Sequence, residues 1–359
     1  MAVISKLANV AAASVAKVVG IVKASIEAVA GVFFTTPATV DIAVGHSNSP
    51  FVSTYPWSSG FGTKYSDPAT LPAGNGIGVD FSPDGADLVI AHPTTPYVTA
   101  YPWSSGFGTK YSNPATLPAN NGREVVFSPN GAVIAVAHLT SPYISTYPWS
   151  SGFGTKYSNP ATLPASTGNG VGFSPSGADI AVAHTTTPFV SAYPWSSGFG
   201  TKYSNPATLP ASDGNSVYFS PDGADIAIAH NNSPYISTYP WSSGFGTKYS
   251  NPATLPTGTG ADVIFSPNGA VIAVAHLTSP YISTYPWSSG FGTKYSNPAT
   301  LPTGNGIGVG FSSDNADIVV AHVISPFVSA YPWSSGFGTK YSDPGTTPAS
   351  TGQKIRFSQ

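Results

Sequence analysis

Histidine and tryptophan are the residues whose spacing first suggests chemistry in this chain of 359 residues. Each type occurs seven times, and consecutive copies within a set lie 46 residues apart; the histidines are His46, His92, His138, His184, His230, His276 and His322. A ring of imidazoles could bind a metal ion, but no Asp, Glu or Cys recurs beside these histidines to complete a set of ligands. We therefore predict no metal site and expect each histidine to cap a turn by hydrogen bonding.

The tryptophans allow two interpretations. Together with Phe61, Tyr65 and their equivalents they could stack on sugars, as in a carbohydrate-binding ring; this alternative site contains Trp57, Trp103, Trp149, Trp195, Trp241, Trp287 and Trp333. They could instead pack against the neighbouring repeat unit, where burial of ~200 Å² of each indole is worth roughly 5 kcal/mol at most. We favour the packing interpretation, and Phe61 and Tyr65 keep the sugar-binding interpretation as the alternative.

A catalytic site in a repetitive chain needs residues that break the repeat. The candidates are Arg123, Glu124, Asp213 and Arg356, which are scattered along the sequence and have no evident partners. We therefore predict no catalytic residues, no cofactor and no enzymatic activity.

Two further motifs have simple structural explanations. Asp84 and Asp87 in SPDGAD suggest calcium, but sister copies read SPNGAV at 128–133 and SPSGAD at 174–179, so the pattern indicates turn chemistry. The glycine-rich GNGIG at 74–78 and 304–308 precedes strand-like sequence, which excludes a phosphate loop at the start of a helix.

The local pattern of one unit, residues 169–214, defines the elements that position these residues. Val171 and Phe173 alternate before a Pro/Gly turn, and ADIAVAH places Ile180, Val182 and His184 on one face. FVSAYPW and a short polar segment, TKYSNP, follow after further turns. Alternation with a period of two and frequent turns predicts four short antiparallel strands per unit. Seven such units predict an all-β fold, a seven-bladed β-propeller of 46-residue blades.

The two ends of the repeat region, residues 38–359, indicate how the ring closes. The C-terminal KIRFSQ supplies an innermost strand, whereas the repeat begins at residue 38 with the second strand of a blade. One blade should therefore combine a C-terminal inner strand with three N-terminal strands, which hides the sheet edge. We expect Ile355 and Phe357 to pair with Ile42 and Val44.

Composition excludes several functional classes. Charged residues make up 8% of the chain, the net charge is −2 and there is no basic run, so no nucleic-acid partner is predicted. The apolar tract at 2–34 is interrupted by four charged residues, so no membrane span is predicted. The chain contains no cysteine, which excludes disulfides and thiol catalysis.

The repeat unit VGFSPSGADIAVAH…PFVSAYPW resembles the WD-repeat and related bacterial propeller families over residues 38–359. It departs from true WD repeats, because no Gly-His opens the unit and no Trp-Asp pair closes the third strand. The SPYI and NPATLP segments are more similar to repeats of bacteriophage and prophage proteins. That resemblance implies a virion location, with a secreted or cell-surface location as the alternative.

The N-terminal segment, residues 1–37, carries an 11-residue apolar repeat, as in Ile4, Val15 and Ile26, that suits either a helix or hairpins. It resembles N-terminal segments of phage virion proteins, which implies attachment to other virion proteins and possible homo-oligomer formation.

One face of the predicted ring varies between units, and the other repeats nearly unchanged. The variable loops are 93–96, 120–124, 212–216 and 257–262, and the predicted contact residues are Thr94, Thr95, Asn120, Asn121, Arg123, Glu124, Asp213, Asn215, Asn231 and Asn232. We therefore expect a non-enzymatic virion structural or adhesion protein that binds a host-surface glycan or protein partner. The alternatives are a multivalent lectin-like propeller and a secreted bacterial surface scaffold.

Overall fold

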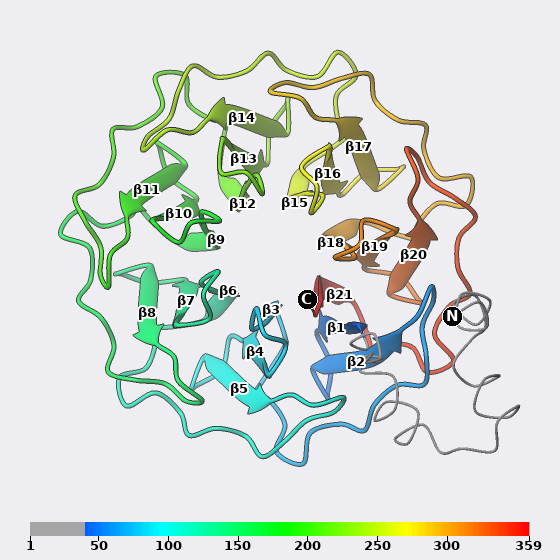
Figure 1. Ribbon diagram of the computed structural model, residues 1–359, viewed down its shortest axis with the longest axis horizontal. Helices are drawn as coiled ribbons and strands as arrows, with labels where there is room; N and C mark the ends of the chain where they lie inside the picture. Colours follow the sequence, from blue (N-terminus) through cyan, green and yellow to red (C-terminus); the bar gives the residue numbers. More distant parts are fainter. Residues whose placement is uncertain (1–39, 359) are drawn as a thin grey trace, which may run out of the picture. The chain divides into compact units, whose positions relative to one another are not determined.

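The computed structural model describes residues 40–358, which form seven antiparallel three-stranded sheets arranged around a central axis (Figure 1). The inner strands are β3 (Gly78–Phe81), β6 (Gly122–Phe127), β9 (Gly168–Phe173), β12 (Gly214–Phe219), β15 (Gly260–Phe265), β18 (Gly306–Phe311) and β21 (Gly352–Phe357). The middle strands are β1 (Val40–His46), β4 (Asp87–Ala91), β7 (Val133–His138), β10 (Asp179–His184), β13 (Asp225–His230), β16 (Val271–His276) and β19 (Asp317–His322). The outer strands are β2 (Val52–Trp57), β5 (Val98–Pro102), β8 (Ile144–Pro148), β11 (Val190–Pro194), β14 (Ile236–Pro240), β17 (Ile282–Pro286) and β20 (Val328–Pro332).

The seven-bladed β-propeller predicted from the sequence is confirmed, including the way in which the ring closes. β21 pairs with β1, so that Phe357 lies opposite Ile42 and Ile355 opposite Val44. One sheet, in the order β2-β1-β21, is thus built from both ends of the repeat region. Within residues 40–358 no helix is long and apolar enough to cross a membrane. The predicted attachment segment 1–37 lies outside the described residues and stays a prediction.

The predicted fourth strand forms only in part. After the outer strand β2, Trp57 makes an isolated bridge with Phe61, and Tyr65 donates its backbone N–H to Thr54 O at 2.9 Å. Between these points Pro56 accepts a hydrogen bond from Gly62 N at 2.8 Å. Its ring nitrogen has no hydrogen to return the bond. Because this proline recurs in every blade, the ladder to the fourth segment stays incomplete.

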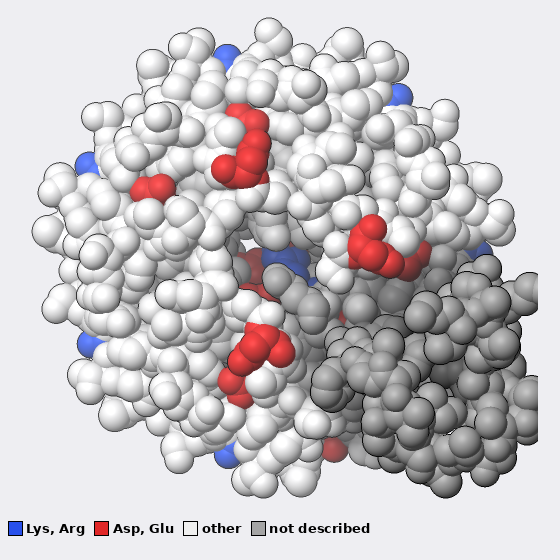
Figure 2. All heavy atoms as spheres, in the orientation of Figure 1, with Lys and Arg blue, Asp and Glu red and all other residues white. Residues whose placement is uncertain are grey.

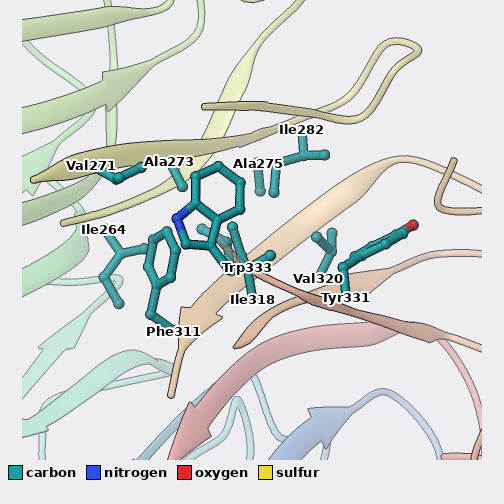
Figure 3. Close-up of a cluster of buried hydrophobic side chains, with 11 residues drawn as sticks. Ile264, Val271, Ala273, Ala275, Ile282, Phe311, Ile318, Val320, Tyr331 and Trp333 are labelled. Atoms are coloured by element: carbon teal, nitrogen blue, oxygen red, sulfur yellow. The ribbon is translucent and has the colours of Figure 1, made fainter. Parts of the chain in front are cut away.

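The hydrophobic core lies between neighbouring sheets. The cluster in Figure 3 joins Ile264, Val271 and Ala273 of one blade to Ile318, Tyr331 and Trp333 of the next. The other described clusters follow the same plan, because alternate residues of every strand face the adjacent sheet.

A buried aspartate clamps five of the blade interfaces. In one of them Asp225 accepts hydrogen bonds from the Tyr249 hydroxyl of its own blade and from Nε1 of Trp287 in the next blade, both at 2.8 Å. Two middle strands carry Val133 and Val271 at the equivalent position. The same interface is therefore built with and without the carboxylate in one ring.

We expect Asp225→Val to lower the free energy of unfolding by about 1–2 kcal/mol, because two hydrogen bonds to a buried carboxylate are lost. The measurement is urea-induced unfolding. The matched variant is Val133→Asp, which places a carboxylate in the equivalent site and should not cost stability if the clamp is real. Equal unfolding midpoints for Asp225→Val and the unmodified chain would contradict the clamp.

Candidate active site

A cavity of about 520 Å³ occupies the centre of the ring. Its wall is formed by the inner strands, and its mouth is lined by residues of the turns that lead from inner to middle strands, including Pro83, Pro129, Pro175, Pro221 and Pro267. Figure 2 shows this hollow from the mouth side, with both basic and acidic side chains inside it. The volume lies within the range of small-molecule sites.

Two rows of equivalent residues run around the inner strands. The first, here called the glutamate row, contains Gly78, Glu124, Gly170, Ser216, Asp262, Gly308 and Lys354. The second, the arginine row, contains Asp80, Val126, Gly172, Tyr218, Ile264, Gly310 and Arg356. Glu124, Ser216 and Lys354 of the glutamate row and all seven residues of the arginine row line the cavity. The alternate residues of these strands, such as Val125 and Phe127, join the interblade core. Because successive residues of a strand point to opposite sides, the core-facing residues of the inner strands are closely similar in every blade, whereas the channel-facing residues differ between blades.

Glycine makes room for the charged residues of the glutamate row. Gly78 lies in the blade before Glu124, and Gly308 in the blade before Lys354. A β-carbon at Gly308 would lie 3.0 Å from the Cα of Lys354, closer than such contacts normally come. In most of these strands a register shift also precedes the row, for instance between Gly122 and Glu124. Such a bulge redirects the side chain that follows it.

Lys354 crosses the channel and joins two carboxylates from distant blades. Its Nζ lies 2.6 Å from Glu124 Oε2 and 2.8 Å from Asp262 Oδ1. Asp262 also accepts hydrogen bonds from the Ser216 hydroxyl at 2.7 Å and from Val263 N at 3.0 Å. Burial would raise the pKa of Asp262, but Lys354 and Arg356 outweigh that effect and hold it below its usual value.

Arg356 lies among three carboxylates without a close bond to any of them. Its Nε is 3.9 Å from Asp80 Oδ1, Nη1 is 3.9 Å from Asp262 Oδ2, and Nη2 is 4.0 Å from Glu124 Oε1. The guanidinium donates from Nη1 to its own strand, at Ile355 O. Within residues 40–358, Nε and Nη2 have no hydrogen-bond partner and remain available to a ligand oxygen.

Glu124 and Asp80 are carboxyls whose pKa values are raised by burial, although Lys354 and Arg356 lie beside them. Burial raises the pKa of Asp80 to about 7, against the opposing pull of Arg356, and Oδ2 accepts a hydrogen bond from Phe127 N at 2.8 Å. Burial likewise raises the pKa of Glu124, which Lys354 and Arg356 oppose. Glu124 Oε1 has no hydrogen-bond partner among the described residues. A buried carboxylate with a free oxygen beside a cavity can act as a general base.

The sequence had suggested that the residues that break the repeat are scattered and unpaired, and for two of the four, Glu124 and Arg356, this is wrong. Glu124 and Arg356 meet in the channel, together with Asp80, Asp262 and Lys354, which the sequence analysis had missed. The placement of Glu124 on the outer contact face is wrong, because its side chain is buried in the channel. Arg123 lies at the bulge beside it, half-buried, and burial lowers its pKa.

The remaining predicted contact residues lie on the two sets of loops at the opposite end of the blades. Asp213, Asn215 and Asn231 come together: Asn215 Nδ2 donates to Asn231 Oδ1 at 2.8 Å, and Asn231 Nδ2 to Asp213 Oδ2 at 3.4 Å. The neighbouring members Thr94, Thr95 and Asn232 are exposed, and Asn120 and Asn121 are half-buried. Their role as a contact face stays a prediction.

The repeated aromatic and imidazole side chains are mostly buried. The seven tryptophans are 5–8% exposed and pack at the blade interfaces, where Trp57 meets Phe61 and Tyr341 edge to face. The glycan-stacking set also includes the half-buried Phe61 and Tyr65. The histidines are fully buried, and His92 shows their role: Nδ1 donates to Thr94 O in the following turn at 2.7 Å, and Nε2 accepts from the Thr99 hydroxyl. The predicted turn-capping role is confirmed for this residue.

No protein-family model and no curated protein matches the chain. Solved structures do match over most of its length. A protein of Bacteroides uniformis named as a candidate 6-phosphogluconolactonase aligns with 89% of this chain and 99% of its own, at 15% identity and a TM-score of 0.67. The periplasmic gluconolactonase of Pseudomonas aeruginosa aligns over 89% and 99%, at 14% identity and a TM-score of 0.66. A Lactobacillus plantarum protein aligns over 89% and 100%, at 15% identity and a TM-score of 0.68.

These comparisons contradict two predictions made from the sequence: that the chain is not an enzyme, and that it is a virion structural or adhesion protein, with lectin and scaffold alternatives. Two of the three propellers described above are named as lactonases, and the resemblance to phage proteins finds no counterpart among the three. Attachment through residues 1–37 and an extracellular location stay predictions. At this identity the likeness establishes the seven-bladed propeller fold.

Proposed function

We propose that the protein hydrolyses a small cyclic ester, a sugar lactone, in the cavity at the centre of the ring. The observation that carries this proposal is the charged cluster of Asp80, Glu124, Asp262, Lys354 and Arg356, of which all but Asp262 line a cavity of about 520 Å³. The names of two matching propellers support the choice of lactones.

Each part of the reaction has a suitable group in the cluster. Glu124, through its unpartnered Oε1, accepts a proton from water, whose oxygen then attacks the acyl carbon. Arg356 offers Nε and Nη2 to the carbonyl oxygen, where negative charge develops. Asp80, whose pKa is raised to about 7, is partly protonated near neutral pH and donates its proton to the leaving ring oxygen as the ester C–O bond breaks.

The supporting residues hold this arrangement in place. Lys354 fixes Glu124 through Oε2, and Oε1 is left without a hydrogen-bond partner among the described residues. Asp262 in turn fixes Lys354 and is itself held by the Ser216 hydroxyl. A positioned and largely dehydrated base of this kind typically contributes about 10²–10⁴-fold to a rate.

The proposal is tested by proton release during hydrolysis of D-gluconolactone, after subtraction of the uncatalysed rate. We expect kcat/KM to fall as pH rises through about 7, because Asp80 loses the proton that it must donate. Asp80→Asn should lower kcat about tenfold or more and remove that fall. Asp213→Asn, on the opposite face, is the control and should change neither value. A rate no faster than the uncatalysed one would overturn the proposed function.

A further inference from the structure

We infer that the cavity selects an uncharged lactone and discriminates against a phosphorylated one. This inference rests on the proposed function and concerns the charge of its substrate. It follows from the balance of charge in the cluster and around the mouth of the cavity.

The cluster itself has no spare positive charge. Three carboxylates, from Asp80, Glu124 and Asp262, face the two cations Lys354 and Arg356. With every group ionised the site carries one excess negative charge, and with Asp80 protonated it is neutral. The guanidinium nitrogens of Arg356 already lie 3.9–4.0 Å from the three carboxylates. A phosphate that approached Arg356 would therefore come within a few ångströms of these carboxylates. Like charges at such separations in an enclosed site are costly.

The mouth of the cavity adds further negative charge. Asp84, Asp222 and Asp314 are exposed on three of the turns from inner to middle strands, and each follows a residue that lines the cavity: Pro83, Pro221 and Ser313. A neighbouring serine hydroxyl lowers the pKa of each of these aspartates, so all three are ionised at neutral pH. None of the corresponding turns of the repeat contains Lys or Arg.

The basic residues of the repeat lie elsewhere. Lys64 and its equivalents follow the outer strands, and Figure 2 shows basic side chains at the outer margin of the ring and acidic ones around the hollow. A cleft bordered by one sign of charge concentrates the field along its opening and slows the entry of ligands of the same sign. A phosphate group carries about −1.5 to −2 charge at neutral pH.

The same field assists the reaction that we propose. Hydrolysis converts a neutral lactone into a hydroxy acid, whose carboxyl ionises once it is formed. The substrate therefore enters without electrostatic cost, and the product leaves a site that repels it. We expect weak inhibition by the product gluconate.

The test compares D-gluconolactone with its 6-phosphate in steady-state hydrolysis by the full chain. We expect kcat/KM to be at least about tenfold higher for the uncharged lactone. The triple variant Asp84→Asn, Asp222→Asn, Asp314→Asn should raise kcat/KM for the phosphate and leave that of the uncharged lactone unchanged. Asn is tolerated there, because in a sister turn Asn130 already makes the equivalent bonds to Ser128 and Ala132.

Binding of two unreactive ring analogues, 1,5-anhydroglucitol and its 6-phosphate, separates this inference from the proposed function. Tighter binding of the uncharged analogue without turnover of either lactone would uphold the selectivity and overturn hydrolysis. Equal or tighter binding of the phosphate, or a selectivity that the triple variant leaves unchanged, would overturn the inference. Binding of neither analogue and turnover of neither lactone would overturn both.

Discussion

Glu124→Gln is expected to reduce kcat for lactone hydrolysis about a hundredfold or more while the ring stays folded. The amide is nearly isosteric, and its oxygen can still accept a hydrogen bond from Lys354 Nζ, which lies 2.6 Å from Oε2 of the glutamate. It has no basic oxygen to take a proton from water, and the loss of a general base typically costs about 10²–10⁴-fold. KM should change little, because the amide keeps its place in the wall of the cavity.

The readouts are steady-state hydrolysis of D-gluconolactone and thermal unfolding of the same preparations. Asp213→Asn is the matched control, since it also replaces a carboxylate by an amide but lies in the loops at the other end of the blades. A Glu124→Gln protein that keeps most of its kcat would show that another group takes the proton. A protein that loses activity only because it unfolds would be recognised by its melting temperature.

The repeat sequence predicts most of the fold because the same local rules apply in every unit. Val171 and Phe173 alternate in the inner strand, and Ile180 and Val182 share a face in the middle strand, as expected from the pattern. The closure of the ring could also be predicted, because the repeat region begins with a middle strand that has no inner strand before it and ends with an inner strand that has no middle strand after it. The sequence did not show that the fourth strand would be incomplete. That outcome depends on whether Pro56 lacks its N–H on the edge of β2 that pairs with the fourth segment.

The cluster could not be predicted from proximity in the sequence. Asp80, Glu124, Asp262 and Lys354 are far apart along the chain, and they meet only because seven inner strands surround one axis. A signal was nevertheless present. Each unit has a six-residue segment that begins with Gly and ends with Phe, such as GREVVF at 122–127. The third and fifth residues of this segment vary from unit to unit, whereas the fourth is always Val or Ile and the sixth is always Phe. When the core residues of a repeat are uniform, variation at the alternate positions of the inner strand indicates a surface outside the core, which here is the lining of the channel.

The seven buried histidines should make the ring unstable in mild acid. All are fully buried, and burial lowers the pKa of each to about 4 from an ordinary value of 6.5. The unfolded chain then binds more protons than the folded one below pH 6.5, so stability falls as the pH drops from 6.5 towards 4. Each histidine contributes about 1.4 kcal/mol per pH unit in this window, and seven together up to about 10 kcal/mol per unit.

Two buried carboxyls of the channel change stability with pH in the opposite direction, but they are fewer than the histidines. Asp80 has a folded pKa raised to about 7, and burial also raises the pKa of Glu124, so both add stability as the pH falls, yet these two channel groups stand against seven histidines. Urea-induced unfolding between pH 7 and pH 5 should show a steep fall in midpoint below pH 6.5. His138→Gln removes one of the seven titrating groups, and the slope of unfolding free energy against pH should drop by about a seventh, whatever the variant costs in absolute stability. His138 shows the neutral arrangement, in which Nδ1 donates to Thr140 O and Nε2 accepts from the Ser145 hydroxyl. A midpoint that stays flat down to pH 5 would contradict the prediction, because it would mean that the imidazoles gain protons without leaving their turns.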